Sequence, residues 1–242
     1  DKGPQRLFYS GPMYRYERPQ KGRNREFFQL SAELFGIESM SAELEVFQII
    51  ETIVKKYKIE DSRLEINSLG SEEDQRNFSK ALQDFLMPLK SKLDKDSQNR
   101  LEKNPLRILD SKSTETKEAL TNAPRIAEFR SKNSTSNFNL LKNLLNDFGI
   151  EYRENENLVR GLDYYNDAVF EWKSDSLGSQ NTFCAGGRYD SLAKKLGGRQ
   201  TPAIGASLGI DRLIIACKDK YKFPSQKPVS YTHLRAHETS ID

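Results

Sequence analysis

Arginines, a carboxylate and an aromatic ring surround a basic loop near the start of the chain. Arg15 and Glu17 are two residues apart, so in a strand their side chains point to the same side. Pro19 and Gly22 interrupt regular structure in the following segment, RPQKGRNR. That segment carries four cations suited to polyphosphate, Arg18, Lys21, Arg23 and Arg25.

This spacing can hold a nucleotide, because guanidinium groups bind phosphate oxygens through two parallel hydrogen bonds. Arg15 would bind the α-phosphate and Arg23 the terminal phosphates. Phe27 would stack on the base, and Glu17 would accept a hydrogen bond from the adenine amino group. The alternative is a surface hairpin whose charges are only solvated. Spacing alone leaves both interpretations open.

A second polar set follows on the same segment, because residues 26–35 (EFFQLSAELF) alternate with period two. This pattern predicts a strand that pairs antiparallel with an aromatic-rich strand over Leu7–Glu17. One face would hold Phe28, Leu30, Ala32 and Leu34, and the other Phe27, Gln29, Ser31 and Glu33. We expect the first face to pack on helices and the second to form a polar floor.

Arg160 is the most informative single residue of the second half. It stands beside Gly161 in Asn157–Trp172, which we interpret as a hairpin turning near Asn166 and Asp167. A buried arginine in a strand needs an anionic partner. That partner is either a ligand or a carboxylate of the chain, such as Asp163 or Glu171.

The elements that must position these residues are helices on an antiparallel sheet. Apolar residues recur at helical spacing after Ser41, and a short strand is predicted at Arg63–Asn67. From Ser71 to about Asp147 the composition becomes charged and amide-rich with helical runs, and Gly149 suits a left-handed helix end. Because a βαβ order with a Gly-rich first turn is missing, the prediction is an α+β fold and not a dinucleotide-binding one.

The predicted organisation has four parts. Residues 1–70 form the first part of a core, 71–147 a helical insertion, 148–224 the second part of the core, and 225–242 a tail that we interpret as non-native. The tail carries both histidines, His233 and His237. Histidine catalysis is therefore not expected in the rest of the chain.

Bulk composition narrows the classes further. The 242 residues are 36% hydrophobic, and 38 basic residues nearly balance 35 acidic ones, so net charge does not indicate nucleic-acid binding. Cys184 and Cys217 are too few and too far apart for a disulfide framework or a four-ligand zinc site, and we predict no protein metal site. No apolar run reaches the ~18 residues of a membrane helix. A reducing, cytoplasmic setting is expected, although composition does not separate cytosol from organelle matrix.

Four ordered motifs resemble histidyl-tRNA synthetases, which are class II aminoacyl-tRNA synthetases. GPMYRYERPQKGRNREFFQL resembles motif 2 of that class, and residues 158–165 (LVRGLDYY) and 186–190 (GGRYD) resemble the two histidyl-specific motifs. Residues 205–212 (GASLGIDR) resemble motif 3. The resemblance covers about residues 6–217 and implies a class II antiparallel sheet flanked by helices, with a helical insertion.

The resemblance also implies the ATP site. Arg212 would pair with the phosphates and stack near the adenine, while Gly205 and Gly209 would let backbone approach the nucleotide. The alternative for these glycines is tight packing of helix on sheet. Together with Arg15, Glu17, Arg23 and Phe27, the implied ATP-binding set includes Gly209 and Arg212.

A histidine pocket is implied in the same way. Glu33 would accept a hydrogen bond from the imidazole, and Gln29 would lie near the polar head of the amino acid. Tyr164 and Tyr165 would close the pocket, and as neighbours in a strand we expect one to face it and the other to pack; the alternative is that both are core aromatics. Arg160 would reach the α-phosphate and the substrate carboxylate.

The implied activity is that of a histidine–tRNA ligase, with ATP and Mg²⁺, histidine and tRNA(His) as its ligands. Arg15, Arg160 and Arg212 are the implied catalytic residues, acting by positioning and charge stabilisation. The family's dimer-forming segment and anticodon-binding domain are not found, so a homodimer is expected of the full-length parent, and activity of this chain alone is not. Two alternatives are a regulatory paralogue in histidine biosynthesis and a tRNA-sensing module.

Overall fold

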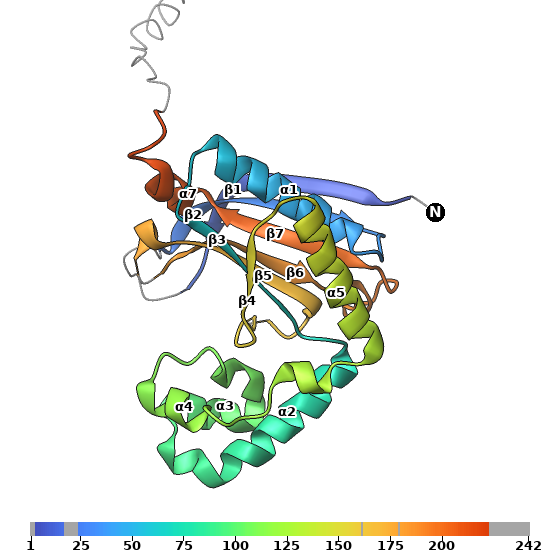
Figure 1. The fold of residues 1–242 in the computed structure, drawn as a ribbon, viewed down its shortest axis with the longest axis vertical. Helices are drawn as coiled ribbons and strands as arrows, with labels where there is room; N and C mark the ends of the chain where they lie inside the picture. Colours follow the sequence, from blue (N-terminus) through green and yellow to red (C-terminus); the bar gives the residue numbers. More distant parts are fainter. Residues whose placement is uncertain (1–2, 17–23, 161, 179, 223–242) are drawn as a thin grey trace, which may run out of the picture.

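The computed structural model describes residues 3–16, 24–160, 162–178 and 180–222 (Figure 1). Its strands are β1 (Gln5–Tyr14), β2 (Glu26–Phe35), β3 (Ser62–Ser68), β4 (Tyr152–Glu154), β5 (Asn166–Ser174), β6 (Thr182–Arg188) and β7 (Ala203–Gly209). Its α-helices are α1 (Ser41–Lys56), α2 (Glu72–Leu86), α3 (Lys95–Lys103), α4 (Thr114–Ala119), α5 (Lys132–Asp147), α6 (Leu192–Lys195) and α7 (Ile210–Cys217). Short 3₁₀ helices are η1 (Met87–Lys92), η2 (Pro105–Ile108), η3 (Ile126–Phe129) and η4 (Asp175–Leu177).

One seven-stranded sheet in the order β1-β2-β7-β6-β5-β3-β4 organises the fold. Neighbouring strands are antiparallel, which confirms the predicted class, except that β4 runs parallel to β3. Parallel neighbours need a long crossover, and the chain makes it through residues 69–151. The sheet is therefore mixed at this edge, where the sequence predicted antiparallel pairing throughout.

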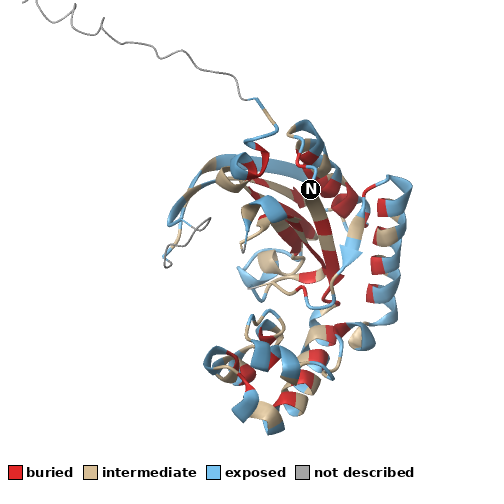
Figure 2. Ribbon diagram, turned by 60° about the vertical axis from the view of Figure 1, so that its left-hand side comes forward, coloured by how far each residue is buried: buried red, intermediate tan, exposed pale blue. Residues whose placement is uncertain are grey.

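Helices α1 and α5 cover one face of the sheet (Figures 1 and 2). Phe47 of α1 packs edge-on against Phe170 and Trp172 of β5, with ring centroids 4.6 and 5.3 Å apart. All three side chains are buried. Leu34 of β2 belongs to the same core, as the alternating pattern predicted, whereas Phe28 of the same predicted face is 48% exposed. This packing leaves the opposite face of the sheet for polar groups.

The segment predicted as an insertion packs in two different ways. Its first part, residues 72–129, has a core of its own, made of Phe78, Leu82, Leu86, Leu93, Leu101, Ile108 and Ile126. Helix α5, in contrast, contributes Phe138, Leu141 and Leu145 to the main core. We propose that the independently packed unit is residues 72–129, shorter than the predicted 71–147.

The chain enters and leaves this unit at neighbouring points. The side chain of Arg130 donates from Nε to the Ser68 carbonyl at 2.9 Å and from Nη2 to Asn67 Oδ1 at 2.7 Å. Ser134 donates to Asp74 Oδ2 at 3.0 Å, and Asp74 also completes the capping box of α2 with Ser71. Hydrogen bonds thus directly join the segment that enters the unit to the segment that leaves it.

The predicted hairpin over Asn157–Trp172 is wrong, because only β5, from Asn166, is a strand and the preceding residues form a loop. Distant side chains satisfy the loop backbone. Asn67 Nδ2 donates to the carbonyls of Glu156 and Leu158 at 3.2 and 3.0 Å, and Gln75 Nε2 donates to that of Tyr165 at 3.0 Å. These bonds replace a strand ladder.

Two smaller expectations concern helix ends and membranes. Gly149 has a φ of +64°, which confirms the left-handed end predicted after the last insertion helix. Among the described residues, no helix combines the length and apolar character needed to cross a bilayer.

Candidate active site

A cavity of about 720 Å³ lies on the sheet face opposite α1. Strand alternation shows which face this is, since Trp172 is in the core while its neighbours Glu171 and Lys173 line the cavity. Most of the predicted site residues meet here: Arg15, Phe27, Gln29, Arg160, Tyr164, Tyr165, Gly209 and Arg212. The predicted residues Glu17 and Arg23 lie outside the described part of the chain.

At one end of the cavity the β1–β2 pair presents an arginine stacked on a ring. The guanidinium carbon of Arg15 is 4.2 Å from the centroid of Phe27, and its Nε donates to the Asn24 carbonyl at 2.8 Å. The sequence predicted Phe27 as a stacking surface for a base. In this structure Arg15 covers the ring, so a base would have to take the other face or displace the guanidinium.

The motif 3 residues lie at the end of β7 and the start of α7. Arg212 Nη1 donates to the Thr182 carbonyl at 2.5 Å, and Asp211 Oδ2 accepts from the Phe28 backbone N–H at 2.9 Å. A Cβ at Gly209 would meet its nearest neighbour, the Phe183 carbonyl oxygen, at 3.7 Å, an ordinary contact distance. Gly209 lines the cavity, and the space beside it would admit a Cβ without a clash.

Gly205 has a different role from the one expected. A Cβ there would lie 1.7 Å from Glu33 Oε2, so Gly205 makes room for a carboxylate of the neighbouring strand. Gly205 lines the smaller hollow and not the large cavity, and the atoms that crowd it belong to a strand side chain and not to a packed helix, as the alternative supposed. Gly186, which is opposite Ala206 on the neighbouring strand, is also a packing glycine, since a Cβ there would lie 2.0 Å from the Gly205 carbonyl oxygen.

Polar groups form the floor of the cavity in a connected set. Gln29 Nε2 donates to Ser31 Oγ at 2.9 Å and to Ser207 Oγ at 3.2 Å, and the two serine hydroxyls are 3.0 Å apart. Ser31 is directly opposite Ser207 in the β2–β7 register. The sheet therefore holds Gln29 by hydrogen bonds, with its carbonyl oxygen as an acceptor for a ligand.

A second hollow of about 450 Å³ adjoins the cavity and contains Glu33. Tyr164, Tyr165, Ala185 and Ser207 line both hollows, so Gln29 and Glu33 share a strand face but lie on either side of this boundary. Burial raises the pKa of Glu33, and a hydrogen bond donated by the Tyr189 hydroxyl partly opposes that rise. Glu33 is thus a partly buried acceptor in a hollow lined mainly by aromatic and aliphatic side chains.

Three tyrosines pack around the boundary between the hollows. The ring centroids of Tyr164 and Tyr165 are 4.6 Å apart, and that of Tyr189 lies 5.9 and 6.4 Å from them. The prediction that one of Tyr164 and Tyr165 faces the site while the other packs is wrong, because both line both hollows. They escape strand alternation because they lie in the loop before β5.

Arg160 also lies in this loop and not in the predicted strand. Its Nη1 donates to Glu171 Oε1 at 2.6 Å, so one of the two carboxylates considered from the sequence is its partner. Both side chains are largely buried, with 21% and 17% of their surface exposed. The guanidinium carbon lies 5.8 Å from the ring centroid of Tyr165.

Sequence reasoning missed two groups at the site. Tyr189 and Arg188 both lie in the GGRYD motif, but neither was assigned a role. Arg188 forms a two-pronged ion pair with Glu43, at 2.6 and 2.7 Å, and both side chains are almost fully buried. Arg188 also contacts Asp190 at 3.1 Å. This pair fastens α1 to β6 beneath the hollow that contains Glu33.

The insertion reaches the large cavity as well. Asp110 and Lys112, which follow η2, line it together with Glu171 and Lys173 of β5. Asn104 donates to Asp163 Oδ1 in the loop that carries Arg160, at 2.5 Å. The insertion and the sheet therefore both border the same volume.

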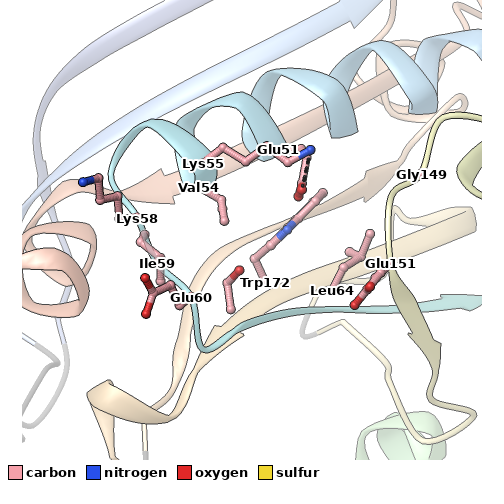
Figure 3. Close-up of a pocket in the computed structure, with 11 residues that line it drawn as sticks. Glu51, Val54, Lys55, Lys58, Ile59, Glu60, Leu64, Gly149, Glu151 and Trp172 are labelled. Carbon is pink, nitrogen blue, oxygen red and sulfur yellow. Dashed lines mark ion pairs between the residues drawn. The ribbon is translucent and has the colours of Figure 1, made fainter. Parts of the chain in front are cut away.

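A further hollow of about 450 Å³ lies beneath α1 on the other face of the sheet (Figure 3). Val54, Ile59, Leu64 and Trp172 line it, and at its rim Lys55 pairs with Glu51 at 3.3 Å. None of the predicted site residues lines it. We therefore identify the 720 Å³ cavity and its tyrosine-walled neighbour as the candidate site.

Comparisons with known proteins agree with this geometry. The family model described as histidyl-tRNA synthetase matches residues 1–213. A histidine–tRNA ligase of Microcystis aeruginosa is 49% identical over 229 residues, which is 95% of this chain and 54% of that protein. The chain thus spans about half the length of the curated relatives it matches.

Solved structures give the same result. The apo histidyl-tRNA synthetase of S. aureus matches with a TM-score of 0.70 and 33% identity, over 88% of this chain and 50% of that one. A Bacillus halodurans protein described as an ATP phosphoribosyltransferase regulatory subunit/histidyl-tRNA synthetase matches with a TM-score of 0.58 and 25% identity, over 88% and 58%. Motifs, fold, family model and relatives agree, and the chain belongs to the histidyl-tRNA synthetase family.

Proposed function

We propose that the full-length protein containing this chain is a histidine–tRNA ligase. It would join histidine and ATP to give histidyl-adenylate and pyrophosphate, and then transfer histidine to the 3′ end of tRNA(His). The observation that carries the proposal is that residues from motif 2, the LVRGLDYY segment and motif 3 surround one 720 Å³ cavity beside the hollow of Glu33.

The chemistry proposed for this cavity needs no general base from the protein. The histidine carboxylate is already ionised and attacks the α-phosphorus, so the protein must align two anions and stabilise developing charge. Arg15, Arg160 and Arg212 surround the cavity and would supply positive charge, with Arg23 added from the loop. Gln29, Glu33 and the tyrosines would hold the amino acid.

Mg²⁺ belongs to the proposal as the ion that accompanies the ATP phosphates. Within the described ranges no group of three or more His, Cys, Asp or Glu residues could hold a metal ion. Mg²⁺ usually keeps several waters and takes one or two carboxylates beside substrate phosphates. Asp110 and Asp211 line the cavity and fit that limited role.

A homodimer is proposed for the full-length protein. β1 is an edge strand with large apolar side chains in solvent, Leu7, Phe8 and Tyr9 being 55%, 79% and 47% exposed. An apolar edge of this kind favours a covering partner surface.

Because tRNA charging serves translation, we place the protein in the cytoplasm.

The first test is histidine-dependent exchange of labelled pyrophosphate into ATP by the full-length protein. We expect exchange, and a loss of about a hundredfold or more in Arg160→Ala, since removing one preorganised donor costs that much. Lys142→Ala is a matched control, because it removes a cation that pairs with Glu154 at 3.0 Å and does not line the cavity. Absence of exchange in an intact dimer would contradict the proposal.

The second candidate function is that of a non-catalytic regulatory paralogue. The matching Bacillus halodurans protein is described as such a subunit as well as a synthetase, and the fold is shared. The retained arginines around the cavity favour the enzyme. Binding of histidine without any pyrophosphate exchange would favour the paralogue instead.

A further inference from the structure

The position of the Arg160 guanidinium depends on side-chain contacts, because its backbone is in a loop. Asn67 fixes the chain just before it, through hydrogen bonds to the carbonyls of Glu156 and Leu158. No strand ladder continues through Arg160 itself. A long arginine side chain in a loop must lose rotamer entropy before it can hold one position.

Glu171 is the group that fixes it. Its Oε1 accepts from Arg160 Nη1 at 2.6 Å, while its Oε2 accepts from Thr182 Oγ1 at 3.0 Å and lies 3.3 Å from Lys173 Nζ. Glu171 sits in the middle of β5, between β3 and β6, where the backbone is held on both sides. The carboxylate is therefore bound at both oxygens on a rigid strand.

The neighbouring charges leave Glu171 available for Arg160. Lys173 has a second carboxylate partner, Glu65, at 2.7 Å, and Glu65 also accepts from Asn155 at 2.7 Å. The side chains of this ion pair are more than four-fifths buried, Lys173 being 16% and Glu65 14% exposed. Glu65 of β3 thus neutralises the charge of Lys173, and the negative charge of Glu171 can orient Arg160.

Besides its contact with the Tyr165 ring, the guanidinium is hydrogen-bonded at one nitrogen. In the part of the chain that the structure describes, the bond from Nη1 to Glu171 is the single hydrogen bond of Arg160, and its buried Nε has no partner. Leaving a buried N–H unpaired is unfavourable, so this pose needs a strong anchor. The remaining Nη donors are left for an anion in the cavity.

We infer that Glu171 is a positioning residue for the reaction, acting through Arg160. It holds the guanidinium where the two substrate anions must meet, and its contribution to the reaction is made through Arg160. This inference rests on the proposed function. A positioning role differs from a purely structural one, because its loss should slow the chemical step more than it weakens binding or folding.

The test compares Glu171→Gln with Glu65→Gln in the full-length protein. Glu65 is the matched control, because it is opposite Glu171 in the β3–β5 register, is equally buried and pairs with the same Lys173, but has no contact with Arg160. Pyrophosphate exchange gives kcat and the KM for ATP, and urea unfolding gives the stability of each variant.

We expect Glu171→Gln to lower kcat by about ten- to hundredfold, as a misplaced catalytic group does, with the KM for ATP changed by less than about twofold. Glu65→Gln should lose similar stability and keep its kcat within about threefold. In an Arg160→Ala background, adding Glu171→Gln should change the rate by less than about twofold.

The inference is overturned if Glu171→Gln keeps its kcat, if Glu65→Gln slows exchange equally, or if Glu171→Gln has its full effect without Arg160. In each of these cases the wild type still exchanges pyrophosphate and Arg160→Ala is slow, so the proposed function stands. Failure of the wild type to exchange would instead contradict the proposed function.

Discussion

Glu33 is a predicted ligand-binding residue whose carboxylate is partly buried. Its carboxylate occupies space that exists because Gly205 has no side chain, and it accepts a hydrogen bond from the Tyr189 hydroxyl. Burial raises its pKa above the ordinary value of 4.5. The folded protein therefore binds a proton at Glu33 more tightly than the unfolded chain does.

The sign of this linkage predicts how Glu33 affects stability. A raised folded pKa contributes stability below pH ~4.5 and loses it as the pH rises through the folded pKa. In Glu33→Gln this dependence should vanish, so the wild type should lose stability relative to the variant as the pH rises above about 4.5. Urea unfolding at several pH values measures it. The exposed Glu118→Gln is the control, and parallel curves for wild type and Glu33→Gln would refute the prediction.

The site could be predicted from the sequence where local spacing determines geometry. Gln29 lies on the predicted polar face of β2 because alternation in a strand needs no distant contact. The position of Arg160 could not be predicted, because residues about 90 positions away in the sequence hold its loop. Asn67 bonds to the Leu158 carbonyl just before Arg160, and Gln75 bonds to the Tyr165 carbonyl a few residues after it. Tyr189 was in a recognised motif, but its approach to Glu33 needs the β6–β7–β2 order, which no local pattern contains.

Among the elements, the centre of the sheet depends on close approach of β6 and β7. A Cβ at Gly186 would lie 2.0 Å from the Gly205 carbonyl oxygen and 2.7 Å from the Phe170 ring. We expect Gly186→Ala to destabilise the protein by about 3 kcal/mol, because backbone cannot move aside cheaply. Gly11→Ala is the control, since a Cβ there has no atom within 4 Å and should change stability by less than about 0.5 kcal/mol. Equal unfolding midpoints for the two variants would contradict this.

The insertion depends on one carboxylate. Asp94 accepts hydrogen bonds from Ser97, Ser111 and Thr116, at distances of 2.6 to 3.0 Å. Burial alone would raise the pKa of Asp94, but these bonds outweigh it and hold the pKa well below the ordinary value. The stabilisation is thus present at neutral pH and is lost as the pH falls below ~3.8.

Asp94→Asn should therefore loosen the insertion at neutral pH. We expect amide hydrogen exchange in residues 94–129 to accelerate on the order of tenfold, after allowing for partial exposure of the carboxylate. The exposed Asp96→Asn, in the same helical turn, should have little effect. If exchange in both variants matches the wild type, Asp94 does not organise the insertion.

The fold of the elements was predictable where one periodicity covers the whole segment. Helix α1 and strands β2 and β3 follow their predicted patterns closely, whereas β1 ends at Tyr14, before Arg15, although its strand was predicted over Leu7–Glu17. The boundary of the insertion was not predictable, because α5 has the same charged and amide-rich composition as α2 to α4. Only the packing of Phe138, Leu141 and Leu145 on the main core distinguishes it.

For the whole molecule, this division predicts which part can be removed. Replacing residues 76–129 by a short Gly/Ser linker keeps Ser71, Asp74 and Arg130. The hydrogen bonds of these residues hold together the segments by which the chain enters and leaves the insertion. The main core should remain folded, and fluorescence of the single tryptophan, the buried Trp172, reports this. If the insertion contacts the tRNA acceptor arm, the KM for tRNA should rise more than that for ATP. Equal rises would count against tRNA contact.

The two ends of the insertion lie next to each other, and this affects how the chain folds and how far the length of the insertion can change. Arg130 bonds directly to Asn67 and Ser68, so the insertion is a closed loop whose two ends are held together on the main body. Closing such a loop costs entropy that grows only with the logarithm of its length, about 0.6 kcal/mol for each doubling. The length of this segment is therefore nearly free to change, while the few bonds at its base are not.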